Sequence, residues 1–433
     1  MATVPRTQQL PHGVGQITGK WLALVIAALA LTIVGVIAYS IETQQGLIAT
    51  GMRNVGTMAG ATWGLYISFV VYFVGVSFAG ITVAALIRVL NWDYLKPLAR
   101  IAELVTIISL ILAAIAIIAD LGQPLRGLLY LPMYARPQSP FFGTFTLVIS
   151  GYLFASLVYF YLDARRDAAA CARVPGRLQR FHRWWAAGYQ DTPQERERRY
   201  RASFWLAIAI VPLLITAHST LGFVFGLQVG RPGWFSAIQA PGFVILAGVS
   251  GIGILAVIVA IVRSSLGAHD RLTIGMFAFL GKALMALTLI YLYLMAVEVI
   301  TAIYAAEHHE QVIFEAMLWG DFAWHYWLTV GSLVVAAALL TFQAYTRSWN
   351  IGLIVASGLL VQVGAVLKRY LLVVPSQTHG GLLPYPQGTY SPSLIEYGMI
   401  IGLVGLGILA FLLFMKVFPI MEVSEESPEG ERT

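Results

Sequence analysis

Ten uninterrupted apolar runs of roughly 20 residues or more dominate this sequence. A helix rises about 1.5 Å per residue, so each run is long enough to cross the hydrocarbon core of a bilayer. Strands of a membrane barrel alternate in polarity over about 10 residues, and the continuous apolarity excludes them. The sequence therefore predicts an all-α transmembrane protein. The expected spans are Trp21–Ser40, Trp63–Leu90, Ala99–Ile118, Phe141–Leu162, Ser203–Phe225, Gly242–Val262, Thr273–Ile300, Phe322–Phe342, Ile351–Leu372 and Ile395–Phe418.

Composition narrows the chemistry that the chain can carry by itself. Only 11% of its residues are charged, against about 25% in soluble domains. Its single cysteine, Cys171, excludes an internal disulfide and a cysteine-ligated iron–sulfur cluster. The sequence has no C-x-x-C-H stretch for covalent haem. The first apolar run is too long for a typical signal-peptide core, so we expect it to be a span.

The distribution of Lys and Arg predicts the orientation in the membrane. With the N-terminus inside, most basic residues lie on the inner side, and the segment 164–202 alone contains ten arginines. The positive-inside rule then puts both termini in the cytoplasm and the protein in the inner (cytoplasmic) membrane. We expect residues 1–420 to form one polytopic membrane domain. Residues 421–433 are predicted to be an acidic, disordered cytoplasmic tail.

Four polar residues fall at one depth near the outer face. Asp120 ends the third span, and Arg126 follows six residues later in a segment that turns at the surface. His218 and Arg369 lie in the outer parts of the fifth and ninth spans. Each has an ordinary alternative explanation: arginines snorkel at helix ends, an aspartate can pair with a nearby arginine, and a histidine can hydrogen-bond between helices. Their coincidence at one depth favours a site.

Oxidation of a quinol would use such a set of groups, because it releases two protons and two electrons. His218 would accept a proton from one quinol oxygen, and Asp120 would be the second acceptor or the proton exit. Arg126 and Arg369 would keep Asp120 ionised and polarise the quinone oxygens.

Small residues near these groups have two interpretations. Ser219 and Gly222 on the fifth span, and Gly75 and Gly80 on the second, would allow a flat ring to approach closely. The same spacing of small residues is common where membrane helices simply pack together. The sequence leaves both interpretations open.

A set of short motifs accompanies these residues along the chain. They are His218–Gly226, Arg231–Trp234, Ala240–Phe243, Trp63–Ile67 with Gly75, Asp120–Gly122, Ser139–Phe141, Leu367–Tyr370, Val373–Pro375 and Pro392–Ser393. In these motifs the chain resembles the polysulfide-reductase membrane-subunit family (NrfD/PsrC type) over essentially all ten spans. The spacing of Asp120, Arg126, His218 and Arg369 looks most like the quinol-binding subunit of alternative complex III and its molybdoenzyme relatives.

The resemblance implies two four-helix bundles, spans 2–5 and 6–9, flanked by the first and last helices. It also implies a cofactor-free site for menaquinone or ubiquinone near the outer face. Electrons would pass to a ferredoxin-like iron–sulfur subunit on the outer side, next to a molybdopterin subunit or a multihaem cytochrome. The chain would then be the quinol/quinone subunit of a larger enzyme, with no activity expected alone, no haem or cluster of its own, and no nucleic-acid partner.

Further polar residues lie within or beside the spans. Glu298 and Asp321 fall toward the outer side, and Glu103 and Lys282 toward the inner side. Charges at such depth line a proton path or form ion pairs that fix helix packing, and both remain open. The sequence Glu307-His308-His309-Glu310 is expected to be a solvated loop, and no metal site is predicted.

Two other functions remain open from the sequence. In a di-haem membrane anchor, His218 would need an axial mate, for which only His325 and His379 are available. A secondary transporter would also have ten spans, but its polar groups usually gather around broken helices at the middle of the membrane. The polar residues here gather at one edge instead.

Overall fold

The computed structural model describes residues 10–52, 63–134, 136, 138–139, 145–379 and 390–422. Most of this part of the chain is helical, and it contains no β-strand. The helices are η1 (Pro11–Gly13), α1 (Gly19–Gln45), η2 (Leu47–Ala49), α2 (Leu65–Val89), η3 (Asp93–Leu95), α3 (Lys96–Asp120), α4 (Pro124–Tyr134), α5 (Phe145–Cys171), α6 (Gln179–Ala186), α7 (Pro193–Gly226), α8 (Gln239–Leu266), α9 (Ile274–Tyr304), α10 (His308–Leu318), α11 (Ala323–Tyr345), α12 (Ile351–Val373), α13 (Pro375–Thr378) and α14 (Leu394–Val417). The acidic tail expected at the C-terminus lies almost entirely outside the described residues.

Ten helices in the described ranges are long and apolar enough to cross a membrane, which confirms the expected number. They are α1, α2, α3, α5, α7, α8, α9, α11, α12 and α14. Some extend beyond the apolar run, most of all α7, which begins ten residues before Ser203. Thr192 and Glu195 form a capping box at its start, so polar residues outside the apolar run begin this helix.

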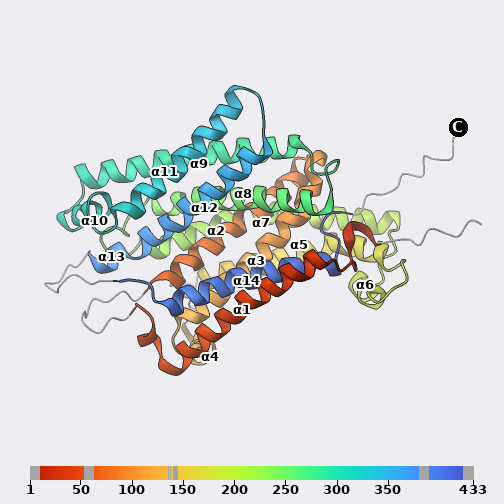
Figure 1. Cartoon of the computed structure of the whole chain (residues 1–433), viewed down its shortest axis with the longest axis horizontal. Helices are drawn as coiled ribbons and strands as arrows, with labels where there is room; N and C mark the ends of the chain where they lie inside the picture. The colour runs from red at the N-terminus through yellow and green to blue at the C-terminus, as the bar shows by residue number, and fades with distance from the viewer. Residues whose placement is uncertain are drawn as a thin grey trace, which may run out of the picture.

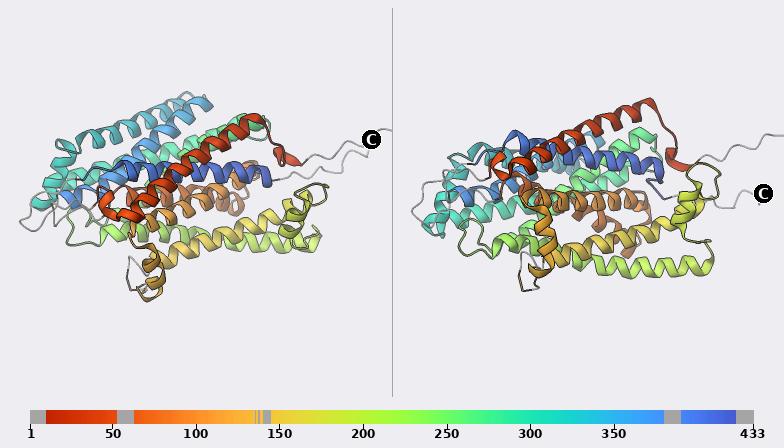
Figure 2. Two further views of the ribbon diagram at one scale, coloured as in Figure 1. Left: turned by 60° about the horizontal axis from the view of Figure 1, so that its bottom comes forward. Right: turned by 90° about the horizontal axis from the view of Figure 1, so that it is seen from below.

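The remaining short helices mark the two ends of the bundle (Figure 1). Helix α6 and the arginine-rich segment 164–202 lie at one end, which we call the basic end. Helices α4, α10 and α13 lie at the other, which we call the distal end, and α4 projects sideways from the bundle (Figure 2). The polar residues expected near the outer face belong to the distal end.

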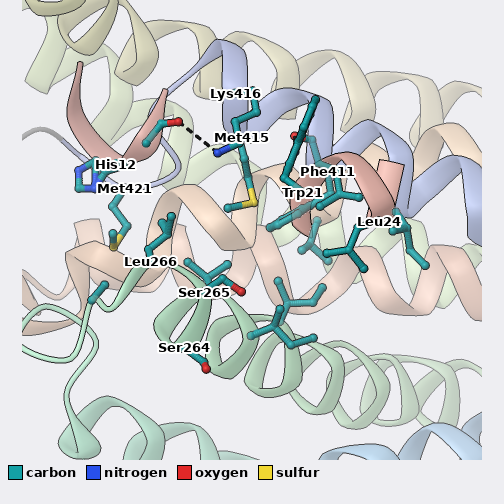
Figure 3. Close-up of a pocket in the computed structure, with 18 of the residues that line it drawn as sticks. His12, Trp21, Leu24, Ser264, Ser265, Leu266, Phe411, Met415, Lys416 and Met421 are labelled. Carbon is teal, nitrogen blue, oxygen red and sulfur yellow. Dashed lines mark hydrogen bonds between the residues drawn. The ribbon is translucent and has the colours of Figure 1, made fainter. Parts of the chain in front are cut away.

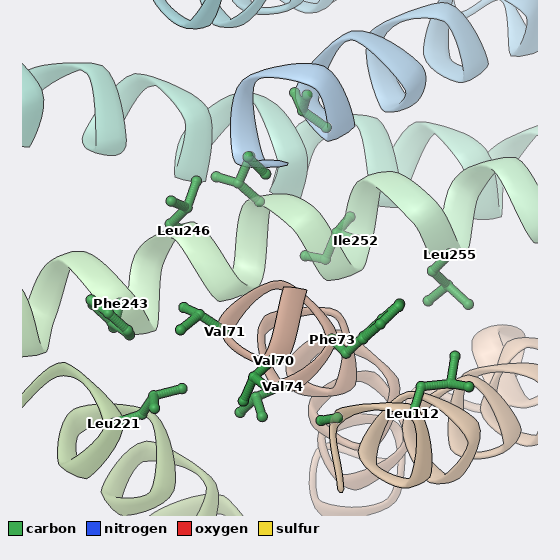
Figure 4. Packing of buried hydrophobic residues seen from close by; sticks show 14 of the residues in the cluster. Val70, Val71, Phe73, Val74, Leu112, Leu221, Phe243, Leu246, Ile252 and Leu255 are labelled. Atoms are coloured by element: carbon green, nitrogen blue, oxygen red, sulfur yellow. The ribbon is translucent and has the colours of Figure 1, made fainter. Parts of the chain in front are cut away.

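Contacts between the spanning helices divide eight of them into two sets of four. Helices α2, α3, α5 and α7 contact one another in sequence around the first set, and α8, α9, α11 and α12 do so around the second. Helix α2 joins the sets through contacts with α8 and α12, and α1 pairs with α14 outside them. Leu221 of α7, Leu246 of α8 and Leu112 of α3 surround α2 (Figure 4). Helix α2 is therefore the element that the other helices share.

Glycines allow α1 and α14 to pack closely together. A Cβ placed on Gly35 of α1 would lie 2.6 Å from the Cα of Gly402 on α14, which is closer than real Cβ atoms approach a backbone. Helices in lipid gain little from the hydrophobic effect when they associate, so close van der Waals contact of this kind stabilises the pair. The α1–α14 pair depends on both residues lacking a side chain.

Substitution at this crossing tests the packing. We expect Gly402→Leu to lower the free energy of unfolding by at least about 1 kcal/mol, because the side chain has no space without separating the helices. A thermal melt of the detergent-purified protein measures the change. Gly331→Leu is the matched control, because a Cβ on Gly331 meets nothing within 4 Å. Equal melting temperatures for the two variants would contradict the close contact.

Both described ends of the chain lie at the basic end. The backbone N–H of Gly15 donates to the carbonyl oxygen of Lys416 at 2.9 Å, so the segment before α1 lies beside the end of α14. Combined with the positive-inside rule, this geometry predicts cytoplasmic termini.

A topology assay checks the orientation. Alkaline phosphatase needs disulfides, which form only outside the cytoplasm. We expect it to be active when inserted at residues 305–307, at the distal end, and inactive when fused at the C-terminus. The reverse pattern of activity would invert the assignment of the two ends.

Candidate functional site

His218 lies in α7 with only 1% of its surface exposed. Its Nδ1 is 2.9 Å from the carbonyl oxygen of Leu214, and its Nε2 is 2.9 Å from the carbonyl oxygen of Val74 on α2. A neutral imidazole has one N–H, so it can donate to only one of these two acceptors. A second proton on the ring would convert the other contact into a hydrogen bond. Both contacts would be hydrogen bonds at once only in the doubly protonated ring.

Arg369 of α12 is buried, with 2% of its surface exposed, and reaches toward α2. Its Nη2 lies 2.7 Å from where a Cβ on Gly75 would be, so any larger residue there would displace the guanidinium. Its charge rests over the ring of Phe243, 5.6 Å from the centroid. Among the described residues, no carboxylate pairs with it, and its Nε has no hydrogen-bond acceptor. This cation is left without a counter-charge.

His218 and Arg369 meet the same turn of α2. Their contacts are with Val74 and Gly75, which are consecutive residues. The two side chains are within electrostatic range of each other. The structure thus brings together one residue from the fifth span and one from the ninth, as the depth argument expected of them.

An aromatic group covers this pair on the distal side. Trp63 and Trp234 stack with ring centroids 5.7 Å apart, and Phe225 meets Trp234 edge-on at 5.0 Å. Phe243, which lies under Arg369, packs 5.8 Å from Phe225. These rings belong to separate motifs, at the start of α2, the end of α7, the following turn and the start of α8. They keep water away from the two polar groups and offer flat apolar surface.

A narrow space borders Arg369 between α8, α9 and α12. Gln239, 6% exposed, has a buried Nε2 with no hydrogen-bond acceptor among the described residues, as has the Nε of Arg369. The space measures about 30 Å³, room for about one water molecule. A ring with two acceptor oxygens would satisfy both donors, provided that neighbouring side chains such as Tyr291 move aside. Sequence analysis missed Gln239, because an uncharged residue at a helix start gives no signal.

Asp120 lies at the distal end as expected, but on another side of α2. Its carboxylate is within electrostatic range of Tyr66, whose hydroxyl donates to Glu42 of α1 at 2.5 Å. Tyr66 and Gly75 are nine residues apart on α2, roughly 13 Å along the helix. The same region holds Glu396, which accepts from the hydroxyl of Tyr390 at 2.5 Å. We call these five residues the distal acid–tyrosine group: Glu42, Tyr66, Asp120, Tyr390 and Glu396.

The other expected site residues lie in different surroundings. Arg126 is exposed on α4 and contacts neither His218 nor Asp120 among the described side chains. Gly80 contacts the carbonyl of Ala102 on α3, and a Cβ on Gly222 would lie 2.7 Å from the Cα of Ala240 on α8. These two glycines serve helix packing, whereas Gly75 makes room for Arg369. Ser219 follows His218 on α7 and is half-buried.

The four residues considered for a proton path are divided between the two ends. At the distal end, Glu298 accepts from Lys368 at 2.6 Å. Asp321 is 81% exposed and lies 3.5 Å from the ring of His379. Lys282 is exposed on α9, 16 residues and roughly 24 Å from Glu298.

Glu103 belongs to a buried ion group at the basic end. Its carboxylate lies 3.9 Å from Arg100, which in turn lies 2.9 Å from Asp167. Arg88 pairs with Asp163 in the same region. Each arginine here has a carboxylate from another helix, so this group fixes α2, α3 and α5 to one another.

No metal centre is evident in the part of the chain that the structure describes. Within it, no group of three or more His, Cys, Asp or Glu is placed to hold an ion. His308 and His309, which the sequence put in a solvated loop, begin α10 with their rings 6.0 Å apart.

Comparisons with known proteins agree over nearly the whole chain. The family described as polysulphide reductase, NrfD, matches residues 53–380. The chain is 28% identical to a putative dimethyl sulfoxide reductase membrane subunit of Halobacterium salinarum, over 97% of this chain and 96% of that protein. It is 25% identical to a selenate reductase subunit of Mesobacillus selenatarsenatis, over 92% and 93% of the two chains. It is 24% identical to the Hdr-like menaquinol oxidoreductase integral membrane subunit of Archaeoglobus fulgidus, over 93% and 94%.

Substitution of the Lys368–Glu298 pair beside Arg369 tests whether Glu298 is needed to balance the charge of Lys368. We expect Glu298→Gln to destabilise the protein by up to about 3 kcal/mol, because Lys368 would remain buried without a counter-charge. Adding Lys368→Met to this variant should recover most of the loss. Thermal melts of the purified variants measure both effects, with Glu315→Gln on the exposed face of α10 as control. A double variant no more stable than Glu298→Gln would contradict this account.

Proposed function

The chain belongs to the polysulphide reductase NrfD family, and we propose that it is the membrane subunit of a respiratory oxidoreductase complex. In this proposal it oxidises quinol, or reduces quinone, at a site near the distal end that needs no bound cofactor. The protein lies in the inner (cytoplasmic) membrane with both termini in the cytoplasm. The names of the relatives, two reductase subunits and a menaquinol oxidoreductase subunit, support this role.

The observation that carries the proposal is the uncompensated charge of Arg369 beside His218. A cation in the hydrocarbon region is costly and ordinarily has a carboxylate partner or a functional role. Arg369 has no carboxylate partner among the described residues, yet Gly75 is kept free of a side chain to admit it. An oxygen that gains negative charge during the reaction would supply the missing partner. Quinones have such oxygens.

When the protein oxidises quinol, each residue has a separate role in this proposal. His218 takes a proton from one quinol oxygen on the ring nitrogen that faces the carbonyl of Val74, which requires the ring to turn toward the quinol. The other ring nitrogen keeps its N–H on the carbonyl of Leu214. Arg369 stabilises the oxygen that loses the proton. The side chain of Gln239 orients the second oxygen of the ring. Reduction of a quinone uses the same groups in reverse.

The second proton leaves through the distal acid–tyrosine group in this proposal. Asp120 is its acceptor, and Tyr66 and Glu42 continue the chain of exchangeable protons. Arg126, exposed at the same end, adds positive charge at the surface. Glu298 and its partner Lys368 line the same narrow space as Arg369 and keep that part of it polar.

The electrons need a partner protein. Cys171 is the chain's single cysteine and lies buried at the end of α5, so this chain has no cysteine set for a cluster. We propose that a ferredoxin-like iron–sulfur subunit docks on the distal end, over the aromatic group. A molybdopterin subunit or a multihaem cytochrome would lie beyond it.

The di-haem alternative is less well supported by the geometry. Iron ligation by His218 would need a second axial histidine, for which the sequence offers His325 and His379. His325 stacks on Tyr370 with ring centroids 5.1 Å apart, on a different helix and at the distal surface. An absorption spectrum of the purified protein distinguishes the two functions, because haem ligation gives a Soret band.

Replacement of His218 tests the proposed chemistry. We expect His218→Ala to lower quinol-linked turnover of the assembled complex by about 10²–10⁴-fold, the usual contribution of a positioned base. Electron transfer from an artificial donor directly to the partner subunits should be unchanged. Steady-state kinetics with a soluble quinol and with the artificial donor measure the two rates.

His308→Ala is the matched control, because this histidine is exposed at the start of α10. Arg369→Gln should also reduce quinol turnover, since glutamine keeps a donor but loses the charge. Complex assembly is checked by size-exclusion chromatography for every variant. Wild-type turnover in an assembled His218→Ala complex would contradict the proposal.

A further inference from the structure

A large crevice opens at the basic end, and its deep end reaches α2 at Tyr72, Phe73 and Val76, next to the turn that contacts the candidate site. Its volume is about 1940 Å³. The α1–α14 pair forms one wall and α8 the other, with α2 and α3 behind them. In Figure 3, Trp21, Phe411 and Met415 lie on one side and Ser265 and Leu266 on the other. The crevice lies between the outer helix pair and α8, while α14 keeps its contacts with α3.

The crevice has the depth of one leaflet. On α14 its lining runs from Val404 to Lys416, and on α8 from Ile254 to Leu266. Each stretch contains 13 residues and spans roughly 18 Å along the helix. One half of a bilayer's hydrocarbon core is about 15 Å thick. The space therefore extends from the membrane surface to about the middle of the bilayer.

The walls are apolar below the rim. Ile258 and Ile261 of α8 face it from one side, and Ile408 and Phe411 of α14 from the other. Val105 and Leu112 of α3 line its back. Water gains nothing from such walls, whereas acyl chains fill them at no cost in hydrogen bonds.

The rim carries excess positive charge. Its basic residues are Lys20, Arg173, Arg271 and Lys416, against one acid, Asp270. Burial, and then the charge of Arg271, lower the pKa of His12 to about 4, so this ring is uncharged at neutral pH.

Three rim residues are already held in place. Arg271 contacts the ring of His12 at 3.0 Å and donates to the carbonyl of Glu422 at 3.3 Å. Lys416 donates to the carbonyl of Gly13 at 3.2 Å, and Trp21 donates to the carbonyl of Leu412 at 3.1 Å (Figure 3). An ammonium group has three donors, so Lys416 retains two for a further acceptor.

We propose that this crevice is a binding site for one anionic phospholipid of the leaflet at the basic end. The acyl chains lie between α1–α14 and α8, and the phosphate lies among the four basic side chains of the rim. Basic pockets between membrane helices bind anionic head groups in this way. An uncharged quinone head would bring no negative charge to balance the excess positive charge of the rim. The site is independent of the proposed quinol chemistry and does not rest on it.

Native mass spectrometry of the intact protein tests the site. We expect an anionic phospholipid to remain bound to the wild type, purified from cells and supplemented with phosphatidylglycerol. Lys20→Gln with Arg173→Gln should weaken its retention by about fivefold for each charge removed. Both side chains are exposed and make no hydrogen bond or ion pair among the described residues, so the fold should be unaffected.

Three further variants make the result specific. Arg180→Gln with Arg198→Gln removes the same charge from exposed positions at the same end but outside the crevice, and should retain lipid like the wild type. Ser265→Trp fills the mouth and should expel the lipid, whereas Ser348→Trp should not. Equal retention by all variants would overturn the proposal. So would extraction of a quinone, or of phosphatidylcholine as readily as phosphatidylglycerol, from the wild type.

Discussion

A buried cation, Arg369, which has no carboxylate partner among the described residues, is the constraint around which the distal half of this protein is arranged. Removing an ion from water costs several kcal/mol even after the protein relaxes. The face of Phe243 returns about 2 kcal/mol when the contact is desolvated, which leaves Arg369 under-compensated. Elsewhere the chain pairs its buried cations: Lys368 with Glu298, and Arg100 with Asp167. This difference is the basis on which we propose Arg369 as a ligand-binding residue.

The two ends of the bundle use ionisable groups differently. At the basic end, arginines from α2 and α3 pair with carboxylates from α5, so the charges lock neighbouring helices together. At the distal end, carboxylates accept from tyrosine hydroxyls, as Glu42 does from Tyr66, and such contacts can exchange protons. A network of ion pairs resists rearrangement, whereas tyrosine–carboxylate contacts allow protons to move. The chemistry is therefore expected at the distal end.

The sequence was sufficient for the spans and for part of the site. Apolar length predicted all ten spanning helices, because no other structure satisfies the backbone in lipid. Counting residues also gave the depth of His218 and Arg369. Counting does not give the direction in which a side chain leaves its helix, which turns by about 100° per residue. Asp120 shares the depth of His218 but lies near Tyr66, on the face of α2 toward α1. Gln239 and Glu42 were missed because their roles arise from contacts between helices distant in sequence.

Helix α2 connects the proposed sites. One face meets His218 and Arg369 through Val74 and Gly75. Tyr72, on the same stretch, donates to Gln362 of α12 at 2.8 Å and also lines the deep end of the basic-end crevice. Because interiors are close-packed, acyl chains against Tyr72 limit the movements open to α2 at that level. The turn that holds the proton acceptor and the cation is thus supported from behind by whatever fills the crevice. A vacant crevice would leave that turn with fewer contacts, in a helix whose position sets the distance between His218 and Arg369.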